Sequence, residues 1–168
     1  MFAIDDQTNS DLTSNLGTKW RLVTDTVMGG VSQGQLRAAM VQGRRCWHMT
    51  GDVSLENNGG FVQASLDLGI AEPLDASGYS GIELEVYGNE ETYNVHLRTT
   101  DTRIVWQSYR ASFFAKPHWK TVKLPFDEFQ PHRITVPLDI RNLRRIGVAA
   151  IGRVFHADLS VGRIVLYA

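Results

Sequence analysis

Hydrophobic and polar residues alternate with a period of two along most of the 168-residue chain. In the segment 81–87, for example, Ile82, Leu84 and Val86 share one face, and polar or aromatic residues share the other. Such alternation is typical of β-strands that bury one face in a core. The pattern predicts ten strands, at residues 20–24, 36–41, 45–50, 61–68, 81–87, 93–99, 104–111, 119–124, 146–151 and 159–167.

Helical periodicity is scarce in this sequence. Residues 125–129 and 138–143 each suit a single turn, the second with Asp139 as its cap. No linker, repeat or low-complexity tract divides the chain, and many short strands at this spacing favour two packed sheets. The sequence therefore predicts an all-β fold, a single antiparallel β-sandwich formed by residues 18–168, with residues 1–17 as an N-terminal segment packed on it.

Two segments, residues 25–32 (DTVMGGVS) and 54–61 (SLENNGGF), each place a pair of glycines among small polar residues. Glycine pairs permit positive φ angles and close approach, and Asp, Asn and Ser tolerate the same turns. Two such loops predict a polar rim that binds a ligand or partner, with simple tight turns as the alternative. The predicted contact residues are Asp25, Met28, Gly29, Gly30, Ser32, Glu56, Asn57 and Asn58.

A second candidate surface lies on the strand at 93–99, where Asn94, His96 and Arg98 share the face opposite its apolar residues. Arg98 offers a planar set of donors for a carboxylate, a phosphate or sugar hydroxyls. An ion pair between Arg98 and Glu83 or Glu85 on an adjacent strand is the alternative. Trp106 is a candidate for stacking on a sugar ring, although packing in the core is the more common role of such a residue.

Composition and charge narrow the class of protein. The formal net charge of −1 argues against a dedicated nucleic-acid-binding protein. The lone Cys46 excludes an intrachain disulfide and fits a reducing compartment. The first 15 residues lack the features of signal and transit peptides, and no segment approaches the roughly 20 apolar residues that cross a bilayer. These features predict a cytoplasmic protein that does not span a membrane.

The sequence offers few signs of catalysis or of metal binding. Glu83 and Glu85 share a strand face, at a spacing that resembles a glycosidase carboxylate pair, and with His96 they form an enzyme hypothesis. The oxygen-bearing residues of the two glycine segments are of the kind that binds calcium, but Asx turns account for them as well. The histidines form no zinc motif, and no nucleophile elbow or phosphate-binding loop is present. The sequence therefore predicts a protein that is not an enzyme and holds no metal or other cofactor.

Residues 25–32, Gly51 and residues 54–61 resemble the complex I intermediate-associated protein family. The resemblance implies a jelly-roll sandwich like the galactose-binding domains and certain carbohydrate-binding modules. Mitochondrial members of the family act as assembly factors for respiratory complex I. The chain departs from the family pattern at residues 88–90, where Gly-Asn-Glu replaces Gly-Asp-Gly. The resemblance extends to residues 79–82, 93–98 and 108–109, to Trp119, residues 124–126 and Phe129, and to residues 138–139 and 146–147.

Taken with the resemblance, the sequence predicts a non-catalytic binding or assembly-factor-like module. It would recognise a protein partner, such as a membrane-complex subunit, in the assembly of respiratory complex I, through the two glycine segments. The alternative is a carbohydrate-binding module that binds an oligosaccharide on the concave sheet face through Asn94, His96, Arg98 and Trp106.

Overall fold

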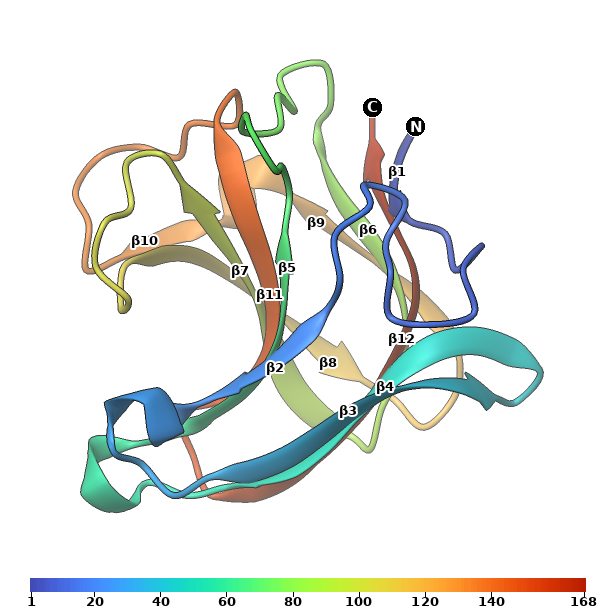
Figure 1. The fold of residues 1–168 in the computed structure, drawn as a ribbon, viewed down its shortest axis with the longest axis vertical. Helices are drawn as coiled ribbons and strands as arrows, with labels where there is room; N and C mark the ends of the chain where they lie inside the picture. The colour runs from blue at the N-terminus through green and yellow to red at the C-terminus, as the bar shows by residue number, and fades with distance from the viewer.

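The structure is a computed structural model that describes residues 1–168, and it contains two antiparallel six-stranded sheets. In the first sheet, β1 (Phe2–Asp5) pairs with the C-terminal end of β12 (Phe155–Tyr167), beyond the residues of β12 that pair with β4 (Arg44–Val53). Figure 1 shows the two chain termini close together at this end of β12. The first sheet has the order β3 (Gln33–Val41), β4 (Arg44–Val53), β12 (Phe155–Tyr167), β6 (Gly81–Tyr87) and β9 (Lys120–Pro125), with β1 (Phe2–Asp5) on β12. The second has the order β10 (Gln130–His132), β8 (Ser108–Ala115), β7 (Glu91–Thr99), β11 (Leu143–Ile151), β5 (Phe61–Asp67) and β2 (Arg21–Thr24).

The hydrophobic core lies between the two sheets and contains 32 buried residues. It is built by the period-two alternation, which turns every second side chain inward, as with Leu84 on β6 and Val95 on β7. Trp20 and Trp47 pack against each other with ring centroids 5.1 Å apart. Each large apolar side chain buried in this way stabilises the fold by roughly 1.5–3 kcal/mol.

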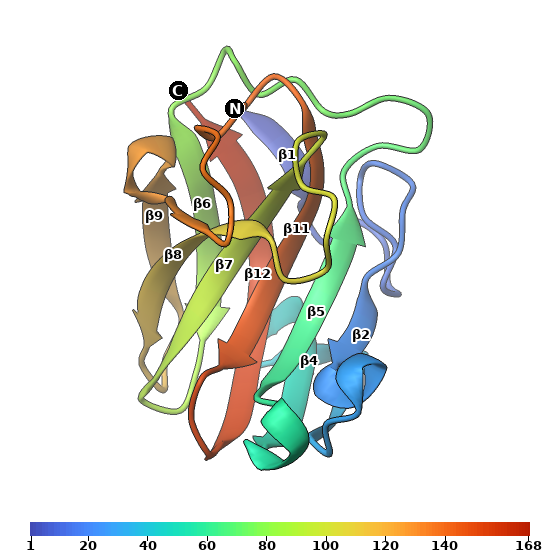
Figure 2. The ribbon, with the colours of Figure 1, turned by 90° about the vertical axis from the view of Figure 1, so that its left-hand side faces the viewer.

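The chain passes repeatedly from one sheet to the other. Strands β5 and β7 lie in the second sheet and the intervening β6 in the first, and β9 likewise lies in the first sheet between two strands of the second. In Figure 2 the second sheet faces the viewer, with β8, β7, β11, β5 and β2 side by side. This crossing between antiparallel sheets confirms the predicted fold class, an antiparallel β-sandwich of jelly-roll type.

Each predicted strand overlaps an observed one, but some boundaries and elements differ. Strand β8 begins at Ser108 rather than at residue 104, because the side chain of Gln107 accepts hydrogen bonds from the backbone N–H groups of Arg103 and Ile104 and closes a loop there. Strands β1 and β10 were not predicted, since four and three residues are too short to show an alternation. Residues 138–143 form an Asx turn rather than a helical turn, with the Asp139 side chain accepting from the backbone N–H of Arg141.

The helical content is limited to three 3₁₀ turns. These are η1 (Asp25–Met28), η2 (Glu56–Asn58) and η3 (Phe126–Glu128). The turn η3 confirms the helical turn predicted at 125–129. None of the three is long or apolar enough to cross a membrane.

Candidate functional site

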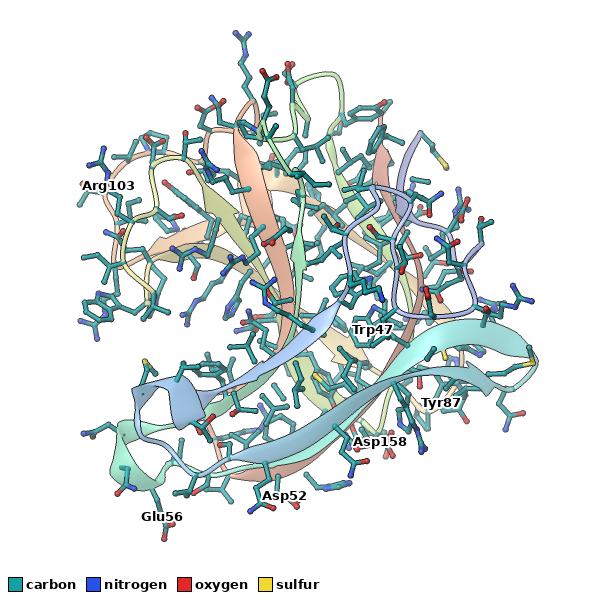
Figure 3. All side chains as sticks on the ribbon, in the orientation of Figure 1. Trp47, Asp52, Glu56, Tyr87, Arg103 and Asp158 are labelled. Carbon is teal, nitrogen blue, oxygen red and sulfur yellow. The ribbon has the colours of Figure 1, made fainter.

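A groove of about 600 Å³ lies on the face of the second sheet that points away from the core. Strands β5, β7, β8 and β11 form its floor, and two loop regions form its walls. One wall contains η1 and η2, and the other is the loop at residues 100–107. Both walls project from the same side of the sheet in Figure 1, and Figure 3 labels Glu56 on one and Arg103 on the other.

The floor of the groove is a row of side chains in register across four strands. Ser65 on β5 pairs with Gly147 on β11, which pairs with His96 on β7, and His96 pairs with Arg110 on β8. Gly147 adds no side chain to this row, and a Cβ there would lie 2.5 Å from the side-chain amide nitrogen of Gln63. The amide of Gln63 therefore covers the middle of the floor.

Two polar atoms of the floor have no hydrogen-bond partner in the protein, the Nε2 atom of His96 and the Oγ atom of Ser65. His96 is 7% exposed and Ser65 is 1% exposed. Burial, together with the charges of Arg110 and His132, lowers the pKa of His96 to about 3. The imidazole is therefore neutral at pH 7, and two buried polar atoms beneath the groove lack a partner within the protein, which is uncommon for buried polar groups.

Four arginines line the groove, and three of them are half-buried. Arg98 donates to the carbonyl oxygens of Ile104 and Val105, at 3.2 and 3.0 Å. Burial, and then the neighbouring Arg145, lower the pKa of Arg98. Burial, and then Arg133, lower the pKa of Arg110. The guanidinium groups thus lie close enough to repel one another.

The wall that contains η1 and η2 is held together by the buried carboxylate of Asp25, which is 0% exposed. Its Oδ1 atom accepts from the N–H of Ser32 at 2.9 Å. Its Oδ2 atom accepts from the hydroxyl of Ser32 and the N–H of Gly60, both at 2.5 Å, and from the N–H of Phe61 at 3.1 Å. Burial alone would raise the pKa of Asp25, but these hydrogen bonds outweigh it and lower the pKa. The two glycine segments therefore meet at one carboxylate.

Each glycine doublet supplies one residue with a positive φ and one that permits close approach. Gly29 and Gly60 have φ angles of 86° and 137°, a region that side chains disfavour. A Cβ on Gly30 or Gly59 would stand 2.5 Å from a carboxylate atom of Asp25. The doublets are thus required by the contact with Asp25 rather than by the turns alone.

The opposite wall, residues 100–107, presents Val105 and the half-exposed Trp106 at the groove. The side-chain amide of Gln107 donates to the carbonyl oxygen of Arg133, which connects this loop to the end of β10. Arg98 anchors the same loop from the floor through its two carbonyl contacts. The position of Trp106 therefore depends on residues from three parts of the chain.

The groove brings together members of both predicted contact sets. Met28 and Asn58 from the glycine segments line it together with His96, Arg98 and Trp106. The other predicted residues lie outside its lining. Asp25 and Ser32 are buried and connect the two loops. Glu56 and Asn57 are exposed on η2, and Gly29 and Gly30 follow η1. The side-chain oxygen of Asn94 accepts a hydrogen bond from the hydroxyl of Ser112.

Several groove residues were missed by sequence reasoning. The alternation along β5 placed Gln63 and Ser65 on a shared face, but nothing local showed which face is open. Arg110 gave a comparable signal on β8. His132 and Arg133 lie at the end of the unpredicted strand β10, so no sequence signal pointed to them.

The carboxylates of the enzyme hypothesis are not brought to the groove. Glu83 and Glu85 lie on β6 of the first sheet, whereas His96 lies on β7 of the second. Glu83 pairs with Lys123 and Glu85 with Arg44, so neither forms the alternative ion pair with Arg98. The Glu83, Glu85 and His96 constellation is therefore not assembled.

Solved structures with the same fold include several sugar-binding modules. The chain is similar to a family 11 carbohydrate-binding module from Clostridium thermocellum in complex with a β-1,3-1,4-mixed-linked tetrasaccharide, with a TM-score of 0.75 and 13% identity over 99% of this chain and 95% of that one. A family 30 carbohydrate-binding module matches with a TM-score of 0.70 and 12% identity, over 100% and 89% of the two chains. At these identities the likeness establishes the fold alone, a jelly-roll β-sandwich.

The family of the chain follows from its sequence. Residues 9–162 match the family of complex I intermediate-associated protein 30. Because the match spans most of the chain, the protein belongs to this family, as the resemblance in the glycine segments predicted. A search of curated protein sequences finds no match.

Proposed function

We propose that the chain is a cytoplasmic, non-catalytic binding protein that recognises a segment of a protein partner during assembly of respiratory complex I. Membership of the complex I intermediate-associated protein 30 family supports the assembly context. The groove is the observation that carries the proposal, because it unites loop and strand residues in one hollow of about 600 Å³. A groove of this volume accommodates a short stretch of polypeptide.

The apolar residues at the groove support a protein partner. Val27 and Met28 on η1 are exposed on one wall, and Val105 and Trp106 are exposed on the other. Exposed methionine and tryptophan are enriched at protein interfaces, because methionine adapts its shape and tryptophan buries a large area. These two pairs offer apolar contacts to side chains of a partner segment that lies along the groove floor.

The proposal is tested by co-purification from cells that assemble respiratory complex I. The tagged wild-type chain is expected to recover complex I subunits, identified by mass spectrometry, and Trp106→Ala is expected to lose them. Ile70→Ala is the matched control, since Ile70 is 84% exposed and does not line the groove. Equal recovery by Trp106→Ala and Ile70→Ala would remove the groove from the proposal, and absence of complex I subunits from the wild-type sample would refute it.

Oligosaccharide binding is a second candidate function. Trp106 is 52% exposed at the groove, where an aromatic ring can stack on a sugar while polar groups bond to its hydroxyls. A structural neighbour is described in complex with a mixed-linked β-1,3-1,4 tetrasaccharide. Titration of the chain with that tetrasaccharide tests this function: saturable heat lost in Trp106→Ala supports it, and a flat titration contradicts it.

A further inference from the structure

The groove carries positive charge with no acidic residue among those that line it. Its lining includes four arginines and two histidines and contains no Asp or Glu. Asp67 lies at its border, where it pairs with Arg145 and Arg21. The chain as a whole has a formal net charge of −1, so this concentration of arginine is local. A site of this composition favours a ligand with negative charge.

Guanidinium donors remain available in the groove. Arg110 uses its Nε atom on the hydroxyl of Ser108, at 2.8 Å, and its two terminal nitrogens make no other hydrogen bond. Arg145 likewise engages Asp67 through Nε, at 3.0 Å. The terminal nitrogens of an arginine form a planar pair that fits the two oxygens of a carboxylate.

The floor between these arginines supplies two further groups. The Oγ atom of Ser65 and the Nε2 atom of His96 are buried, unpartnered and on the groove side of the sheet. A hydroxyl and the N–H of a neutral imidazole both donate to a carboxylate oxygen. Gly147 separates Ser65 from His96 in the cross-strand row, and the side-chain amide of Gln63 lies above it.

The mixture of donors and apolar walls distinguishes a peptide from a saccharide. Sugar hydroxyls donate as well as accept, and this arginine-rich lining offers them no carboxylate as an acceptor, only amide, hydroxyl, imidazole and main-chain groups. Val27 and Met28 face Val105 and Trp106 across the groove. Apolar side chains on either side of an acidic residue would contact these walls.

We propose that the groove binds an acidic peptide segment, in which a glutamate or aspartate carboxylate is held by Arg98, Arg110 and Arg145. Apolar residues next to that carboxylate pack on Met28 and Trp106. The inference rests on the proposed function, because it names the kind of partner segment that the same groove recognises.

A nuclear magnetic resonance titration with two synthetic peptides tests the inference. The capped peptide Gly-Leu-Glu-Gly-Glu-Leu-Gly is expected to shift the backbone amide of Gly147 and the ring nitrogens of His96. Its copy with glutamine in place of both glutamates is expected to bind at least tenfold more weakly. Equal binding of the two peptides, or shifts confined to residues outside the groove, would overturn the inference.

Variants of the groove arginines complete the test. Arg110→Gln is expected to weaken binding of the glutamate peptide at least fivefold, and Arg133→Gln provides a second variant of a groove arginine at an exposed position. Arg37→Gln, on β3 of the first sheet, is the control and is expected to bind as the wild type does. Tighter binding of tetragalacturonate than of the glutamate peptide would reassign the groove to an acidic saccharide and overturn the inference.

The outcomes also separate this inference from the proposed function. If complex I subunits are lost in Trp106→Ala but retained in Arg110→Gln, the partner proposal stands and acidic recognition is wrong. If the glutamate peptide binds in the groove but the wild-type chain recovers no complex I subunit, the preference for an acidic segment stands and the assembly role is wrong.

Discussion

Replacement of Asp25 by asparagine tests the contact that joins the two glycine loops. The two side chains have the same shape, but the amide exchanges one acceptor oxygen for an NH₂ group. In either orientation of the asparagine amide, its NH₂ group faces at least one N–H donor from Ser32, Gly60 or Phe61. A hydrogen bond to a charged group contributes about 1.5–3 kcal/mol, and a buried donor without an acceptor costs about 1–3 kcal/mol. We expect Asp25→Asn to lower the free energy of unfolding by about 2–4 kcal/mol.

Urea unfolding at pH 7, followed by tryptophan fluorescence, measures this loss. Asp52→Asn is the control, because the Asp52 side chain is 80% exposed and its partner His156 is exposed as well. An exposed pair of this kind contributes little, so the control is expected to stay within about 0.5 kcal/mol of the wild type. Equal urea midpoints for Asp25→Asn and Asp52→Asn would refute the role assigned to the buried carboxylate.

The same variant has a pH signature. Hydrogen bonding lowers the pKa of folded Asp25 below its ordinary value of 3.8. The unfolded chain therefore takes up the proton first, so the contribution of Asp25 to stability is complete well above pH 3.8 and declines as the pH falls below it. The difference in the free energy of unfolding between wild type and Asp25→Asn is expected to narrow as the pH falls from 5 to 3, a range that includes the ordinary pKa of 3.8. A difference that stays constant over this range contradicts the charge-assisted bonds.

Three further predictions follow from burial and close packing. The pKa of His96 is 6.5 for the unfolded side chain and about 3 in the folded protein. The free energy of unfolding of the wild type should therefore fall by about 1.4 kcal/mol for each unit by which the pH drops between these two values. His96→Gln should flatten this slope in urea midpoints measured against pH. Gly30→Ala places a Cβ 2.5 Å from the Asp25 carboxylate and should cost about 1–3 kcal/mol in thermal unfolding, whereas Gly78→Ala, with open space around it, should cost nothing. Burial raises the pKa of the Cys46 thiol, so iodoacetamide should label it in urea and not in the native protein; rapid native labelling, detected by mass spectrometry, would contradict its placement in the core.

The fold was predictable from sequence wherever a strand is long enough to repeat its pattern. Strand β6 alternates strictly over seven residues, and its apolar face is buried as expected. Strand β10 has three residues and contains Pro131, so no periodicity could reveal it. Alternation also does not show which sheet a strand joins. The consecutive strands β6 and β7 suggested a contact between Arg98 and Glu85, but these residues lie in different sheets.

The candidate site was predictable in part. The residue types that share a strand face follow from the local sequence, whereas their grouping into one groove depends on contacts between distant parts of the chain. The pattern of β7 placed His96 and Arg98 on one face, and the glycine doublets marked a special loop geometry. The partners of Asp25 lie 7 to 36 residues further along the chain, so its burial could not be foreseen. Trp106 was expected on a strand and instead lies on a loop, yet it reaches the same groove.

Arg98 faces the ligand groove while it also bonds to the backbone of the loop that carries Trp106. Any attempt to redesign specificity by exchanging this arginine would therefore alter two properties at once, the charge that the site offers and the order of its aromatic wall. Directed evolution toward a new ligand would have to begin at Arg110 or Arg133, where no loop carbonyl depends on the guanidinium group.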